Sequence, residues 1–180
     1  YMFTFFFISN FAAVPFWVWL SKIIGKHKAY IASFTLFALS HPLYLLLGEG
    51  DFWWMLPITI LTGFAAGGFH VLANSMQADV IDIDTLKSGE NRTALFFSTW
   101  SFTQKMAASL GSWLALTALA LVGFNTSPEA SNNSDQLFGL SLLFSSMASI
   151  FFFIAIAIIW KYPITEDFHS EIRKSLEKQK

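Results

Sequence analysis

A single lysine lies within a stretch of the sequence that otherwise carries no charge. Lys105 falls near the middle of residues 93–123, and every other residue of that stretch is neutral. A cation at membrane depth is costly, so such a residue is rare unless it faces a cavity, a protein partner or a substrate. The residue types on the same helix face therefore indicate what chemistry Lys105 can support.

Serines recur on both sides of Lys105 at helical spacing. Steps of four and seven residues in either direction reach Ser98, Ser101, Ser109 and Ser112. Positions at this spacing share one face of an α-helix, and Gln104 and Trp100 flank that face. The pattern predicts a water-filled path in which Lys105 binds a hydroxyl group or an anion of a substrate.

Other roles for Lys105 stay open from the residues alone. It could pair with a carboxylate of a neighbouring helix and only fix packing, although the apolar stretches contain no Asp or Glu that could serve. It could also titrate as part of ion coupling. His70, the other ionisable group at depth, could face the same cavity or stay neutral and hydrogen-bonded between helices.

The composition indicates the medium in which these residues work. Hydrophobic residues make up 54% of the chain and charged residues 13%, against about 25% charged in soluble domains. Five apolar stretches cover residues 1–21, 29–48, 52–78, 93–123 and 137–160. A spanning helix needs roughly 20 apolar residues, and backbone groups in lipid must bond within their own segment. We therefore expect an all-α integral membrane protein with five transmembrane helices in residues 1–160.

The basic residues indicate the orientation of these helices. Ten of the eleven Lys and Arg lie in three segments on one side: Lys22, Lys26, Lys28, Lys87, Arg92, Lys161, Arg173, Lys174, Lys178 and Lys180. The positive-inside rule then predicts a cytoplasmic tail at residues 161–180 and an external N-terminus. Tyr1 already lies in an apolar run with no basic segment before it, which argues against a signal peptide and predicts a piece of a longer protein.

Small residues and prolines predict details of the helices. Gly63 and Gly67 form a small-xxx-small pair that permits close helix contact. Pro15 and Pro42 could each kink a helix, because proline lacks the backbone N–H. The tail resembles a short surface helix that Thr165 could cap. The absence of cysteine from the sequence excludes disulfides and thiolate metal sites.

The acidic segment at residues 77–92 is the only candidate for a catalytic or metal site. We expect a solvated cytoplasmic loop there, since the spacing of its acids fails the calcium-loop pattern. A membrane enzyme would need paired acids or a metal cluster, and Asp79, Asp82 and Asp84 lack His or Glu partners at ligand spacing. A non-transporting membrane scaffold is the other alternative to a carrier.

Several short motifs follow one another along the chain. An acidic motif and a turn occupy Ala78-Asp79-Val80-Ile81-Asp82 and Ser88-Gly89-Glu90-Asn91-Arg92, and the next helix carries Trp100-Ser101-Phe102 before Lys105. The first span ends in Pro15-x-Trp17-x-x-Leu20-Ser21-Lys22-x-x-Gly25-Lys26. As a set, these motifs resemble the glycoside–pentoside–hexuronide:cation symporters of the major facilitator superfamily, the melibiose-permease type. Ile83, in place of Tyr, and Thr93-Ala94 depart from the family pattern.

This resemblance implies a fold and a function. The chain would be the C-terminal part of a twelve-helix major facilitator fold, helices eight to twelve, and would not be an enzyme. It would take part in the transport of a glycoside, pentoside or hexuronide coupled to a cation, Na⁺ or H⁺, in a bacterial inner membrane. Its partners would be the sugar, the cation, membrane lipid and the N-terminal half of the same transporter, with no nucleic acid.

The resemblance also assigns roles to residues. Lys105 would contribute to the central cavity, and Ser101, Gln104, Trp100 and His70 would face the sugar. Asp79, Asp82, Gly89 and Arg92 would form a cytoplasmic gating loop. The family's cation site uses acids of the N-terminal helices, so no cofactor and no metal ligand is expected among these residues.

Overall fold

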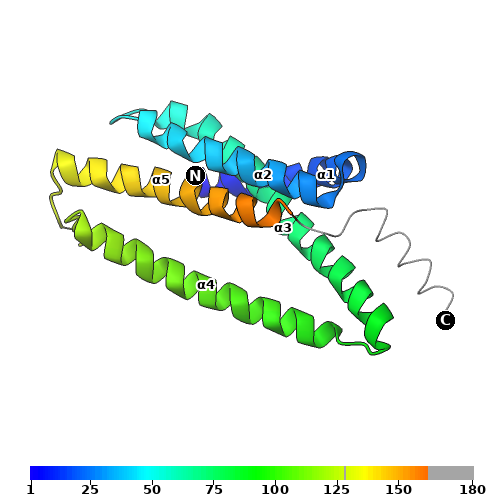
Figure 1. Ribbon diagram of the computed structural model, residues 1–180. Coiled ribbons are helices and arrows are strands. Elements are labelled where there is room, and N and C mark those ends of the chain that lie inside the picture. The colour runs from blue at the N-terminus through cyan, green and yellow to red at the C-terminus, as the bar shows by residue number, and fades with distance from the viewer. Residues whose placement is uncertain (128, 162–180) are drawn as a thin grey trace.

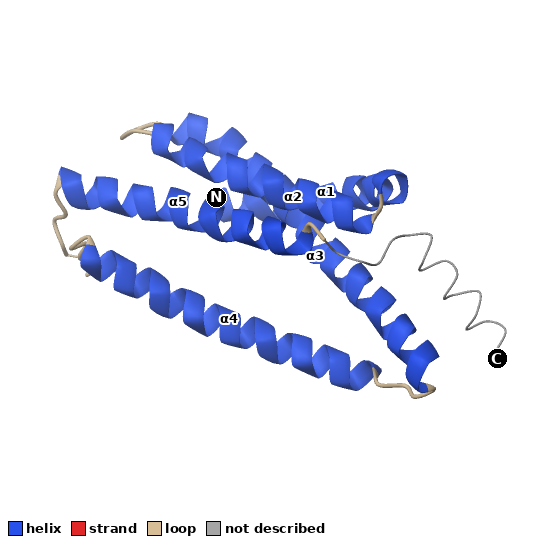
Figure 2. Cartoon of the chain, in the orientation of Figure 1, coloured by secondary structure: helices blue, strands red, loops and turns tan. Residues whose placement is uncertain are grey.

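Long apolar segments in lipid satisfy their backbone groups by forming helices, and the computed structural model follows this rule. It describes residues 1–127 and 129–161. In chain order these form α1 (Met2–Ile24), α2 (Lys26–Ser40), the 3₁₀ helix η1 (His41–Leu46), α3 (Phe52–Ser88), α4 (Thr93–Leu121) and α5 (Ser134–Ile159). Figures 1 and 2 show them as rods joined by short connections, with no strand in the described part. The all-helical prediction is confirmed, and the predicted tail helix lies outside the described residues.

Single residues set the ends of several helices. Gly25 adopts φ 88° between α1 and α2, and Gly89 adopts φ 70° where α3 ends. These are backbone conformations that a Cβ disfavours. The side chain of Asn133 accepts the backbone N–H of Gln136, and the Gln136 side chain accepts the N–H of Asn133. This reciprocal capping fixes the start of α5.

The two prolines act differently. Pro42 interrupts the predicted span at residues 29–48, because the α-helix ends at Ser40 and continues as the 3₁₀ helix η1. Proline cannot donate a backbone hydrogen bond, and its ring clashes with the carbonyl four residues earlier. Pro15, in contrast, lies inside α1, which continues to Ile24.

α1 and α3 pack closely through the predicted small-residue pair. A Cβ added at Gly63 would collide with the carbonyl of Phe6, and one added at Gly67 would collide with the carbonyl of Asn10. Hydrogen bonds reinforce this contact, because Ser9 Oγ donates to the Ile60 carbonyl at 2.7 Å. The prediction that these glycines form a packing face is confirmed.

α2 and α5 pack on the same bundle through aromatic rings and one buried hydrogen bond. The ring of Phe152 on α5 lies 4.8 Å from that of Phe34 and 4.5 Å from that of Phe37, both on α2. Ser149 Oγ donates to the carbonyl of Ala38 at 2.7 Å. In lipid, where helices gain little from apolar burial alone, such packing and hydrogen bonds hold a bundle together.

The acidic segment is helical where a loop was expected. α3 has 37 residues and continues to Ser88, so only residues 89–92 form the turn. The segment between Gln77 and Ser88 contains no Gly or Pro, and the first Gly, at position 89, ends the helix. At about 1.5 Å per residue, α3 is about 55 Å long, much longer than the roughly 30 Å hydrocarbon core.

The connections that carry basic residues and the two that carry only acidic charges lie at opposite ends of the molecule. Figure 1 shows the α1–α2 turn, the α3–α4 turn and the end of α5 at one end of the molecule, and the other two connections at the opposite end. Four helical segments are long and apolar enough to cross a membrane: residues 2–24, 26–46, 52–88 and 134–159. α4, with 29 residues, is not among them. The chain is a multi-pass membrane protein.

Candidate functional site

The functional candidates on α4 depend on which of its faces meets the bundle. α4 lies apart from the tight α1–α2–α3–α5 group in Figure 1, and none of its residues is buried. It begins at Thr93, so Lys105 is about 18 Å along the helix. The lysine stem spans only part of that distance.

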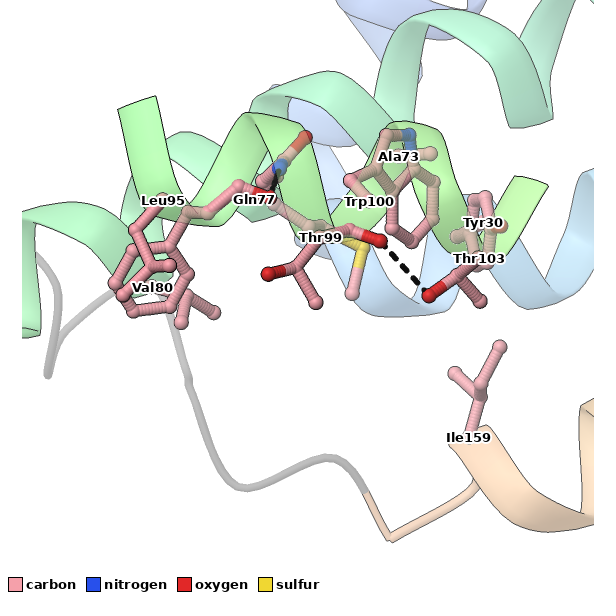
Figure 3. A pocket seen from close by; sticks show the side chains of 11 residues that line it. Tyr30, Ala73, Gln77, Val80, Leu95, Thr99, Trp100, Thr103 and Ile159 are labelled. Carbon is pink, nitrogen blue, oxygen red and sulfur yellow. Dashed lines mark hydrogen bonds between the residues drawn. The ribbon is translucent and has the colours of Figure 1, made fainter. Parts of the chain in front are cut away.

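One face of α4 lines a cavity of about 500 Å³ near the α3–α4 turn. α4 contributes Leu95, Phe96, Thr99, Trp100 and Thr103 to it. Tyr30 of α2, Gln77 of α3 and Ile159 of α5 complete the walls, as Figure 3 shows.

The same face continues along a second cavity, of about 630 Å³, between α4 and α5. α4 contributes Ala107, Leu110, Gly111, Leu114, Ala115 and Leu119 to this cavity. The residues of both cavities follow one another at three- and four-residue steps, which is the period of a single helix face. This face of α4 is therefore the one directed at the rest of the chain.

The serine–lysine stripe lies on the opposite face. Lys105 is two residues beyond Thr103, a rotation of about 200° around the helix. None of the stripe residues lines either cavity, and all are exposed: Ser98, Ser101, Lys105, Ser109 and Ser112. Among the described residues, no carboxylate lies within ion-pair distance of Lys105. The five helices therefore offer no packing partner for this charge.

The structure separates Trp100 from the residues with which it was grouped. Trp100 is half-buried and lines the first cavity with Tyr30 and Gln77 (Figure 3). Its position is about 140° around the helix from Lys105. Gln104, one residue before Lys105, is exposed at the edge of the stripe. The sequence spacing placed Trp100 close to Lys105 along the chain, but the helix turns the two side chains apart.

His70 is not brought to Lys105. It is exposed on α3, and its ring lies 4.8 Å from the ring of the preceding Phe69. It lines neither of the cavities against α4. His70 and Lys105 therefore share no contact within the described residues, and a common role needs another part of the protein between them.

Gln77 is a residue that the sequence interpretation missed. Its Nε2 donates to the carbonyl of Phe96 at 3.2 Å and so joins α3 to α4. Its Oε1 is buried without a partner among the described residues. The only signal in the sequence was an amide at the end of an apolar run, immediately before the acids.

The predicted gating residues gather at the basic end of the bundle, with Lys26 as an unexpected member. Lys26, at the start of α2, contacts both carboxylate oxygens of Asp79 on α3, at 2.6 and 2.7 Å. Asp79 is only 6% exposed. Gly89 ends α3, and the Arg92 guanidinium pairs with the exposed Glu90 at 2.9 Å. Asp82 is half-buried on α3.

Within the described residues, no three His, Asp or Glu side chains come together as a metal site. The groups that the stripe and its edge offer to a ligand are the Lys105 ammonium, the serine hydroxyls and the Gln104 amide. They can bind hydroxyl groups or an anion, and they include no acid that would hold a cation.

Comparison with known proteins identifies a family and several relatives of the chain. The family described as MFS/sugar transport protein matches residues 1–166. The uncharacterized symporter YjmB of Bacillus subtilis is 26% identical over 95% of this chain and 37% of its own length. The sodium-dependent lysophosphatidylcholine symporter 1-B of Danio rerio is 27% identical over 93% of this chain and 32% of its own. The glucuronide carrier protein homolog of Escherichia coli is 21% identical over 96% and 37%.

Two conclusions follow from these matches. The chain spans about a third of the length of the curated relatives it matches. The family and these relatives are transporters rather than enzymes. Since the family match covers most of the chain, the chain belongs to the MFS/sugar transport protein family.

Proposed function

We propose that the chain is part of a secondary transporter that moves a sugar, of the glycoside, pentoside or hexuronide class, together with Na⁺ or H⁺. The serine–lysine stripe of α4 lines the substrate path, with Lys105 binding a hydroxyl or carboxylate group of the sugar. The carrier lies in a bacterial inner membrane with residues 161–180 in the cytoplasm. The coupling cation binds elsewhere in the longer protein.

The observation that carries this proposal is the direction of the stripe. Lys105 and four serines lie on the face of α4 that is opposite the cavity-lining residues, and Gln104 lies at the edge of that face. A lysine at the centre of a lipid-facing helix costs about 3 kcal/mol on insertion scales. A lipid-exposed stripe of this kind is therefore unfavourable. The matched relative is about three times as long as the match. In a protein of that length, further helices could face the stripe across a water-filled path, and the polar groups would then not meet lipid.

Alternating access suits this arrangement. In such carriers, two helical bundles rock around a site near the middle of the membrane. α4 would present its polar face to the opposite bundle, and its apolar face would rest on α3 and α5. The Lys26–Asp79 pair and the short turn at residues 89–92 would then lie at the cytoplasmic end of the moving bundle.

A second substrate class has specific support. Two relatives that match at least as well as the glucuronide carrier homolog are the sodium-dependent lysophosphatidylcholine symporter and a sphingosine-1-phosphate transporter of Xenopus tropicalis, which is 26% identical over 92% of this chain and 32% of its own length. In this alternative, Lys105 binds the phosphate of an amphiphilic lipid, and the apolar wall of the path receives its chain.

Uptake into proteoliposomes by the full-length polypeptide tests the proposal. Sugars with and without a carboxylate, and a lysophospholipid, are offered under imposed Na⁺ or H⁺ gradients. The sugar proposal expects gradient-dependent sugar uptake that falls at least tenfold in Lys105→Met and recovers in part in Lys105→Arg.

Lys87→Met is the matched control, because Lys87 is exposed in the last turn of α3 and outside the stripe. It should retain uptake. Lysophospholipid uptake alone would favour the second class. Sugar uptake that is unchanged in Lys105→Met would rule out the role given to the stripe.

A further inference from the structure

A third cavity lies in the opposite half of the bundle from the basic turns. It has a volume of about 320 Å³ and is formed by α1, the α2–η1 junction, α3 and α5. Its wall carries the aromatic rings of Phe3, Phe6, Phe7, Phe37 and Phe144, and two methionines, Met2 and Met55. Its polar groups come from His41, Tyr44, Thr59 and Thr62. α4 contributes nothing to it, so the cavity is separate from the stripe.

The hydroxyl groups in this cavity have a defined direction of donation. Thr59 Oγ1 donates to the carbonyl of Met55 at 2.9 Å, and Thr62 Oγ1 donates to the carbonyl of Thr59 at 2.9 Å. Both threonine protons are therefore engaged. The Tyr44 hydroxyl lies 3.3 and 3.4 Å from the two threonine oxygens, and its single proton can be donated to one of them at a time. The lone pairs of the Tyr44 oxygen remain able to accept.

The imidazole of His41 has a free acceptor for the same reason. Its Nδ1 lies 3.2 Å from the carbonyl of Phe37, and a carbonyl can only accept, so Nδ1 carries the proton. In the neutral ring Nε2 is then an acceptor. Within the described residues no hydrogen bond engages Nε2, and it is not among the fully buried polar atoms without a partner. His41 is only 8% exposed, and its side chain is part of the cavity wall.

These two acceptors belong to one cluster of aromatic rings. The ring centroids of His41 and Tyr44 are 5.8 Å apart, and the ring of Phe144 lies 5.7 Å from the first and 5.3 Å from the second. No residue that lines the cavity carries a formal charge when His41 is neutral. An ion would find no counter-charge, whereas an apolar molecule would meet aromatic rings, of which Phe3, Phe7 and Phe144 are exposed. The site offers hydrogen-bond acceptors, so a suitable ligand would supply a hydrogen-bond donor.

We propose that this cavity binds a small neutral alcohol, with an apolar body against the phenylalanine rings and a hydroxyl group that donates to His41 Nε2 or Tyr44 Oη. The volume is at the lower end of the range of ligand pockets, about 300–1,000 Å³, which fits a short-chain or single-ring alcohol better than a full lipid. The site would act independently of the transport path along α4.

Photolabelling of the full-length polypeptide in lipid nanodiscs tests this site. The probe is an octanol analogue with a diazirine on its chain, and labelled residues are located by mass spectrometry. The proposal expects label on residues that line the cavity, such as Met2, Met55 and Phe144. Unlabelled 1-octanol should compete about tenfold better than 1-methoxyoctane, because the ether lacks the donor and loses one buried hydrogen bond.

Variants then test the two acceptors. His41→Phe combined with Tyr44→Phe keeps two rings in the wall but removes both proposed acceptors, and it should reduce the difference between the alcohol and the ether, with the Thr59 and Thr62 oxygens as the acceptors that are left. His70→Phe makes the same histidine replacement on an exposed surface and should leave the difference intact.

If a variant fails to fold, the comparison of 1-octanol with 1-methoxyoctane on the unaltered protein still tests the proposal. Equal competition by octanol and its ether would overturn the proposal. So would an absence of label from the cavity, since another part of the full-length polypeptide would then fill it.

Discussion

The ammonium of Lys26 contacts both carboxylate oxygens of Asp79, at 2.6 and 2.7 Å, and so joins the start of α2 to the long helix α3. The Asp79 side chain is 8% exposed and the Lys26 side chain 23% exposed. Removing one partner of a buried pair is costly, because it leaves the other charge buried without compensation. The pair therefore fixes the basic end of the bundle, provided that both charges are present.

Asp79→Asn should destabilise the bundle. The substitution keeps the shape of the side chain but leaves Lys26 without its counter-charge. We expect a loss of about 2 kcal/mol, below the usual range for a fully buried pair because Lys26 reaches some solvent. Unfolding of the chain in detergent with increasing dodecyl sulfate, followed by circular dichroism, measures this loss.

Glu90→Gln is the matched control for the charge substitution. Glu90 pairs with Arg92 at 2.9 Å, but the two side chains are 67% and 45% exposed. Exposed pairs contribute roughly 0–1 kcal/mol, so this variant should unfold almost as the unaltered chain does. Equal effects of the two substitutions would contradict a structural role for the Lys26–Asp79 pair.

Gly63→Ala should separate α1 from α3. The added methyl group would meet the backbone carbonyl of Phe6, which cannot move aside as a side chain could. Overpacking of this kind costs about 1–3 kcal/mol. Gly111→Ala is the control, because nothing lies within 4 Å of its added Cβ, and alanine favours a helix by about 1 kcal/mol over glycine. The first variant should lower stability in the same detergent assay, and the second should preserve or raise it.

Much of the fold could be predicted from the sequence because lipid leaves few choices. Long apolar runs predicted the approximate positions of the five α-helices, and Gly63 and Gly67 identified the close contact between α1 and α3. The length of α3 was underestimated because hydropathy detects where lipid ends and not where a helix ends. Residues 77–88 are polar, but they contain no residue that breaks a helix before Gly89.

The candidate site was predictable only in part, for a geometric reason. Periodicity grouped Lys105 with its serines correctly, since all of them lie on the face of α4 that lines neither cavity. Periodicity could not say which face meets the bundle, so Trp100 was placed with the stripe although it lines the first cavity. The Lys26–Asp79 contact joins residues 53 positions apart, a distance over which a single sequence carries no pairing signal.

Trp17→Phe should weaken the α1–α3 contact by a different mechanism. Trp17 is 3% exposed, and its Nε1 donates to the carbonyl of Phe64 at 2.7 Å. Phenylalanine keeps most of the apolar surface but loses this hydrogen bond, at a cost of about 1 kcal/mol. Trp113→Phe, at a position that is 62% exposed, should cost little. A loss of stability that is the same at both positions would show that the bond adds nothing.

Cysteine replacements along α4 should reveal its two faces. The chain contains no cysteine, so each variant carries a single thiol. Ser101→Cys and Ser109→Cys lie on the stripe, whereas Ala107→Cys and Leu114→Cys lie on the face that lines the cavity against α5. A thiol must ionise to react, and ionisation needs water. If the stripe borders an aqueous path, its two thiols should react with a charged methanethiosulfonate about tenfold faster than the two thiols on the cavity-lining face.

The measurement is the rate of modification of the full-length polypeptide in membrane vesicles, read by mass increase. The two stripe positions are eight residues apart, so an aqueous path along the helix should modify both while sparing Ala107→Cys between them. A gradient of reactivity that follows depth alone would place all of α4 in lipid or in packed protein. Equal rates on the two faces would mean that the stripe borders no path, and Lys105 would then need a protein partner to account for its charge.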